Sequence, residues 1–84
     1  MSADELKRLK VDKVADAREI PCPGPLLEAK RAMQCVPMAG VIEVISSDIG
    51  TTLDIPVWAE EVGHEYLGMI KEPGIWRLYV RRAR

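Results

Sequence analysis

The chain has 84 residues, of which 48% are hydrophobic and 30% are charged, so it has room for one compact domain of ordinary globular composition. Its formal net charge of -1 argues against a domain that mainly grips a nucleic-acid backbone, because such domains are strongly basic. The sequence contains no apolar run of the length that a secretory signal or a membrane span requires, which predicts a cytoplasmic protein.

The beginning of the chain is polar and mixed in charge. This composition predicts a flexible N-terminal segment at residues 1–10 and one folded domain at residues 11–84. Weak alternation of apolar and polar residues predicts a short strand at 11–17.

Two helices are predicted. Apolar residues at helical spacing, among them Ala29 and Met33, predict a first helix over residues 23–36. A second apolar stripe follows Thr51 and Thr52, either of which is a plausible N-cap, and Gly63 is a typical helix end.

The remaining elements are strands. The β-branched run at 41–47 predicts a buried strand, and the Pro73-Gly74 turn predicts a hairpin in which Gly74 has a positive φ. The order β-α-β-α-β-β predicts an α+β fold, a two-layer α/β sandwich with two helices packed on one face of a four-stranded mixed sheet.

The stretch "IPCPGP" places a cysteine at the start of the first helix. With Cys22 as N-cap, Pro23 and Pro25 fall at N1 and N3, where no intrahelical hydrogen bond is lost. The amides of Gly24 and Leu26 are then nearest the sulfur, and the helix macrodipole lowers the thiol pKa by roughly one unit or less. Gly24 also leaves room for a partner or an adduct. The stretch therefore predicts a rigidly held, reactive thiol rather than a small buried side chain.

The rest of the sequence limits the chemistry of Cys22. Cys35 lies 13 residues further on, about 20 Å along the same helix, so it cannot form an intramolecular disulfide with Cys22. No CxxC motif occurs and His64 is the only histidine, so neither a metal site nor a cofactor is expected. His64 is expected to be structural, and both tryptophans are expected in the core. What remains is a single thiolate that accepts a group and passes it on.

These motifs resemble those of the TusA/SirA-like sulfur carrier family, whose mark is Cys-Pro-x-Pro at the opening of the first helix. Here "CPGP" occupies 22–25, and "DIPVW" and "GHE" follow at matching separations. The resemblance implies that Cys22 carries sulfur as a persulfide or an S-sulfonate adduct. It implies a cysteine desulfurase or rhodanese as donor, and a DsrE-like or other protein as acceptor in tRNA thiolation or sulfur oxidation. Lys30 and Asp48 match positions that would contact a partner or adduct.

The chain departs from the family pattern beside the cysteine, where Glu19 replaces the usual Gly and Pro21 is added; Gly50 and Cys35 are further departures. Glu19 and Pro21 alter the loop beside the thiol, so they affect which partner protein the chain binds rather than its chemistry. Such a protein is expected to be a monomeric relay carrier rather than a self-standing enzyme. A small regulatory or RNA- or protein-binding module without thiol chemistry is the alternative, and a thiol redox enzyme is a third reading, disfavoured because no resolving cysteine lies nearby.

Overall fold

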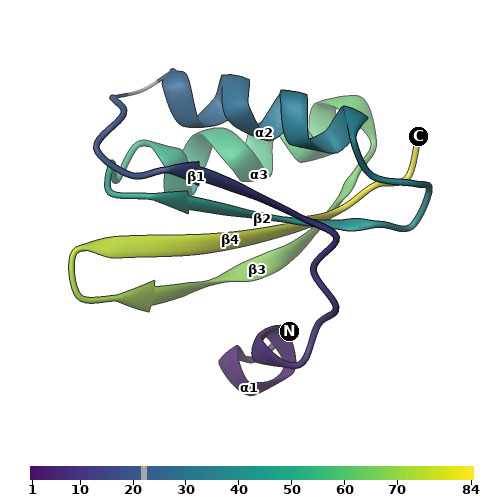
Figure 1. Cartoon of the computed structure of the whole chain (residues 1–84), viewed down its shortest axis with the longest axis horizontal. Helices are drawn as coiled ribbons and strands as arrows, with labels where there is room; N and C mark the ends of the chain where they lie inside the picture. The colour runs from purple at the N-terminus through teal and green to yellow at the C-terminus, as the bar shows by residue number, and fades with distance from the viewer. Residues whose placement is uncertain (22) are drawn as a thin grey trace.

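The computed structural model of the chain describes residues 1–21 and 23–84. Figure 1 shows two helices stacked over one sheet, with a third, short helix on the opposite side. The elements, in chain order, are α1 (Ala3–Lys7), β1 (Lys13–Ala17), α2 (Gly24–Gln34), β2 (Val41–Ser46), α3 (Thr51–Val62), β3 (Glu65–Glu72) and β4 (Ile75–Arg81).

The sheet has the strand order β1-β2-β4-β3 and is mixed, as predicted. β1 pairs with β2 in parallel, which requires the crossover that α2 supplies. β4 pairs antiparallel with both β2 and β3, and the β3–β4 hairpin turns at Gly74, whose φ of 78° confirms the predicted glycine turn. The two-layer α+β prediction is therefore confirmed.

The main core lies between the sheet and the two long helices. The inward residues of β2 and β4 are fully buried there, and they pack against Ala29 and Met33 of α2 and Ile55 and Trp58 of α3. Trp58 is buried and Trp76 packs at the edge of this core, as predicted. In the described residues, no helix has both the length and the apolar character needed to cross a membrane.

The start of α3 differs from the prediction. Neither Thr51 nor Thr52 is the N-cap; that position belongs to Gly50, which makes no side-chain cap. The Thr51 hydroxyl is buried and lies 2.8 Å from the Ser46 hydroxyl, while the Thr52 hydroxyl donates to the Ile49 carbonyl. Both threonine side chains are thus used in fastening the helix to the preceding loop.

The sheet face opposite α2 and α3 is half apolar and half ionic. Its apolar half is a small second cluster that contains Leu67, Ile70 and Tyr79. Its ionic half is built around Arg77, which pairs with Glu72 at 2.8 Å and Glu43 at 3.4 Å. The Tyr79 hydroxyl donates to Glu43, and burial followed by this carboxylate raises the Tyr79 pKa. Tyr79 is buried because the second cluster, which includes Leu6 of α1, lies over it.

The polar composition of residues 1–10 does not reveal the helix that the structure places there. Ser2 and Glu5 form a capping box at the start of α1, and the Met1 amino group donates to the Leu67 carbonyl. Leu6, only 1% exposed, projects into the second cluster. Leu6 docks the helix, with Leu9 packed beside it, and two leucines in a polar stretch are too few to make a detectable periodic pattern. Flexibility of this segment in solution stays a prediction.

Replacement of Leu6 tests how firmly α1 is docked. We expect Leu6→Ala to lower the free energy of unfolding by about 2–3 kcal/mol, because it empties a buried leucine site. Leu53→Ala is the matched control, since Leu53 is 68% exposed, and it is expected to change stability by less than about 0.5 kcal/mol. Urea denaturation followed by circular dichroism measures both. Equal, small effects would mean that the segment is detached from the sheet.

Candidate functional site

The carboxyl ends of β1 and β2 lie at one edge of the sheet because the two strands are parallel. The helices that follow them, α2 and α3, both begin at this edge, as Figure 1 shows. Cys22 precedes the start of α2 in the sequence, and its own placement falls outside the described residues. Its neighbours Pro21 and Pro23 are described and are both exposed.

Helix α2 begins one residue later than the sequence predicts. Pro23 is the N-cap, and its carbonyl accepts the Leu27 amide at 3.1 Å; Gly24 is therefore N1 and Pro25 is N2. The prediction of Pro23 at N1 and Pro25 at N3 is wrong by one position, although neither proline interrupts the helix. Pro25 is fully buried and so anchors the first turn to the core.

Gly24 is required by the packing of the loop that precedes α2. Its amide donates to the Pro21 carbonyl at 2.8 Å, so it is not a free donor for a nearby anion. A Cβ on Gly24 would lie 2.1 Å from Cγ2 of Ile20. The glycine is therefore needed for the close approach of the Ile20 side chain to the helix start. Open access for a partner remains a prediction, but internal packing already requires glycine here.

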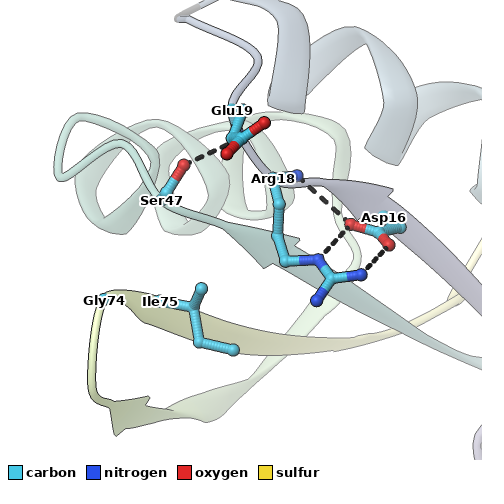
Figure 2. Close-up of a pocket in the computed structure, with 6 residues that line it drawn as sticks. All are labelled: Asp16, Arg18, Glu19, Ser47, Gly74 and Ile75. Atoms are coloured by element: carbon cyan, nitrogen blue, oxygen red, sulfur yellow. Dashed lines mark hydrogen bonds and ion pairs between the residues drawn. The ribbon is translucent and has the colours of Figure 1, made fainter.

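The loop after β1 is held in a constrained conformation. Glu19 has a φ of 65°, in the left-handed region, and its amide donates to the Ser47 hydroxyl at 2.8 Å. Left-handed backbone favours glycine, so Glu19 is strained in this conformation. Arg18 forms a two-pronged ion pair with Asp16, at 2.9 Å and 2.7 Å. Figure 2 shows both interactions beside the start of β4.

The loop after β2 is fastened by buried hydroxyl groups. Ser46 is fully buried and accepts the Asp48 amide at 3.0 Å, in addition to its contact with Thr51. The Asp48 carboxylate accepts the Gly50 amide at 2.8 Å, an Asx turn that leads into α3. The two loops at this edge are therefore positioned by specific hydrogen bonds, and Ser47 joins one to the other.

Two adjoining hollows lie at this edge. One, of about 400 Å³, is lined by the stretch 19–21 together with the stretch 47–49, so the structure brings Asp48 beside the loop that leads to Cys22. The other, of about 500 Å³, is lined by Arg18, Ser47 and the turn at Gly74, as Figure 2 shows. Arg18 and Ser47 were not candidates from the sequence, since neither belongs to a motif. The sequence signal that could have found them is their position just after parallel strands, where ligand sites often lie.

Lys30 does not lie at this edge. It faces a third hollow of about 300 Å³, formed toward the other end of α2 and α3, which Met33 and Trp58 also line. Lys30 and Asp48 line different hollows, so the structure does not bring these two candidates together, and a contact of either with a partner or adduct stays a prediction. In the part of the chain that the structure describes, no group of three or more His, Cys, Asp or Glu side chains is placed to hold a metal ion.

His64 contributes to structure, as predicted. Its Nδ1 accepts the Ala83 amide at 3.1 Å, and its ring meets Trp58 edge-on at 5.5 Å. Burial, and then the nearby Arg82 and Arg84, lower the pKa of His64 below its ordinary value. The imidazole is therefore held neutral, with Nδ1 as a hydrogen-bond acceptor.

Comparison with known families adds to this geometry. The family model described as "Sulfurtransferase TusA" matches residues 13–82, most of the chain. The chain belongs to the TusA family. Its match begins at β1 and ends just after β4, so α1 of this TusA-family protein lies outside the shared region.

Individual relatives agree with this assignment. Over 84% of its length, the chain is 41% identical to a "Putative sulfur carrier protein" of Archaeoglobus fulgidus, covering 97% of that protein. It is 32% identical to the sulfur carrier protein TusA of Pseudomonas entomophila, over 84% of this chain and 89% of that one. Its fold is similar to that of a crystallised SirA-like protein from Desulfitobacterium hafniense, with a TM-score of 0.69, 27% identity and coverage of 86% and 99%.

Glu19, in the loop after β1, has a left-handed backbone, and this gives a stability prediction. We expect Glu19→Gly to be more stable than Glu19→Ala by about 1 kcal/mol, because only glycine adopts the left-handed conformation without strain. Both variants remove the carboxylate, so the difference between them reports the backbone alone. Urea denaturation measures it. Equal stability would show that residue 19 is not left-handed in solution.

The lowered pKa of His64 predicts a pH dependence of stability. Protonation of His64 is less favourable in the folded than in the unfolded chain, so its contribution is fully present above 6.5, its ordinary pKa. That contribution is lost as the pH falls from there toward the lowered folded value. In His64→Asn the amide oxygen can still accept the Ala83 amide. We expect this variant to have a flatter stability profile between about pH 7 and pH 5.5 in urea denaturation. An unchanged profile would contradict the assignment.

Proposed function

We propose that this TusA-family protein is a sulfur carrier that holds sulfur on Cys22 as a persulfide and relays it between proteins. The observation that carries the proposal is the family match across residues 13–82, which includes the "CPGP" motif. The described geometry is consistent with it. Exposed Pro21 and Pro23 flank the cysteine in sequence, and the eleven-residue helix α2 begins two residues after it.

The chemistry proposed for Cys22 is a thiol exchange without net oxidation. Its thiolate attacks the terminal sulfur of a donor persulfide, a sulfur–sulfur bond forms on Cys22, and the donor's sulfur–sulfur bond breaks. The donor leaves as a thiolate, and an acceptor thiolate then removes the terminal sulfur from Cys22 in the same way. The positive end of the α2 macrodipole favours a thiolate beside it by about 0.3–1 kcal/mol.

Donor and acceptor are proposed by class. A cysteine desulfurase or a rhodanese would load Cys22, and a DsrE-like or other carrier would unload it in tRNA thiolation or sulfur oxidation. An S-sulfonate or thiosulfonate is the alternative load. With a rhodanese and thiosulfate, the rhodanese takes the outer sulfur as a persulfide and releases sulfite, so Cys22 again receives one sulfur atom. Asp48 lies beside the loop before Cys22, so we assign it to a contact with the partner protein.

Intact mass measurement tests the carrier role. The reduced protein is incubated with a cysteine desulfurase and cysteine, or with a rhodanese and thiosulfate. We expect the wild type and Cys35→Ser to gain the mass of one sulfur atom, which dithiothreitol removes, because Cys22 alone is loaded. Cys22→Ser should gain nothing. Cys35 is exposed and free, so Cys35→Ser is the matched control for a second accessible thiol.

Two outcomes would contradict the proposal. One is no gain of mass with either donor; the other is an equal gain in Cys22→Ser. Salt-sensitive RNA binding that survives Cys22→Ser, together with either outcome, would instead indicate a binding module without thiol chemistry.

A further inference from the structure

A hollow at the far end of the two long helices is separate from the cysteine edge. Its apolar floor is formed by Met33 of α2 with Trp58 and Val62 of α3, and its volume is about 300 Å³. Lys30, on its rim, is eight residues beyond Cys22 in sequence, and helical rise carries the chain about 1.5 Å per residue along α2. Met33 of the floor is nine residues beyond Gly24, so it lies more than two turns from the start of α2.

The rim of this hollow is cationic. Lys30 of α2 stands on one side, and Arg82 and Arg84 follow β4 on the other. Among the described residues that line the hollow, none is Asp or Glu. His64 also lines the hollow. After burial, Arg82 and Arg84 help to lower the pKa of His64, as expected where the local potential is positive.

We propose that this hollow binds an acidic segment of a partner protein, which inserts one large apolar side chain between carboxylates that meet Lys30 and Arg84. The apolar floor suits the inserted side chain, and the rim charges stand on separate elements rather than converging on one point. Carboxylates on both sides of an apolar residue match this layout. The segment would thus be recognised by charge complementarity around a buried anchor.

A phosphate ligand fits the hollow less well. Bidentate arginine is the usual means of gripping phosphate, but the Arg82 guanidinium already donates to main-chain oxygens of Val36 and Arg84, each at 2.6 Å. These two hydrogen bonds use guanidinium donors of Arg82 that a phosphate would otherwise need. Lys30 and Arg84 remain as the cations of the rim and stand on different elements, which suits two carboxylates better than one phosphate.

This site does not depend on sulfur chemistry. A partner held at the hollow would leave the "CPGP" edge of the sheet uncovered, since the two lie at different ends of α2. Binding should therefore be the same in Cys22→Ser as in the wild type, so the failure of this proposal and of the carrier role can be told apart.

His64 is the only histidine and provides a reporter of binding. The full chain is titrated with the capped peptide acetyl-Asp-Glu-Leu-Phe-Asp-amide, and the His64 ring and the two tryptophan indole signals are followed by NMR. We expect saturable shifts of the Trp58 indole and a rise in the His64 pKa, because carboxylates offset the field of the arginines. The capped peptides with Asn and Gln for the acids, or with Ser for Leu and Phe, should bind at least about tenfold more weakly.

Charge reversal distinguishes this site from general attraction to acids. Lys30→Glu should weaken binding about fivefold or more, whereas Arg31→Glu, the neighbouring exposed position on the same helix outside the hollow, should have little effect. Circular dichroism verifies that both variants fold. Equal weakening by the two variants, no binding of the acidic peptide, or tighter binding of adenosine monophosphate than of the peptide would overturn the proposal.

Discussion

The parallel pairing of β1 with β2 is the constraint on which the rest of the molecule depends. A parallel pair needs a crossover helix, so α2 must lie on the sheet and begin where β1 ends. The same geometry brings the loops after both strands to one edge, where Ser47 joins them through the Glu19 amide. The surroundings of the "CPGP" motif are thus a consequence of strand direction, which local sequence then refines.

Much of this architecture could be predicted because it is periodic. The β-branched run of β2, the apolar stripe of α2 and the Pro73-Gly74 turn each have a local signature, and all three were found close to their true bounds. The cysteine motif could also be located, since prolines in a first helical turn are a local signal. The placement of Cys22 itself stays a prediction from that signal.

The remaining features depend on contacts between distant residues. The docking of Leu6 needs the cluster formed by β3 and β4, and the requirement for Gly24 arises from Ile20 across the loop. The N-cap of α3 could not be chosen from the sequence, because Thr51 is a good cap residue whose hydroxyl is used by Ser46 instead. The sequence made both Lys30 and Asp48 candidates for contact with a partner or adduct. It could not show that Lys30 lies further along α2, in a different hollow.

The ionic half of the second sheet face limits how this molecule can meet others. Arg77, Glu43 and Glu72 already pair with one another there, so a partner lying flat on this surface would have to strip water from charges that have partners within the chain. The apolar half of the face is occupied by α1. Stacking of two sheets is therefore disfavoured, and recognition is directed to the helical layer and the strand ends. A carrier of this family would thus meet its partners through the helical layer and the strand ends, and this broad face of the sheet would stay free.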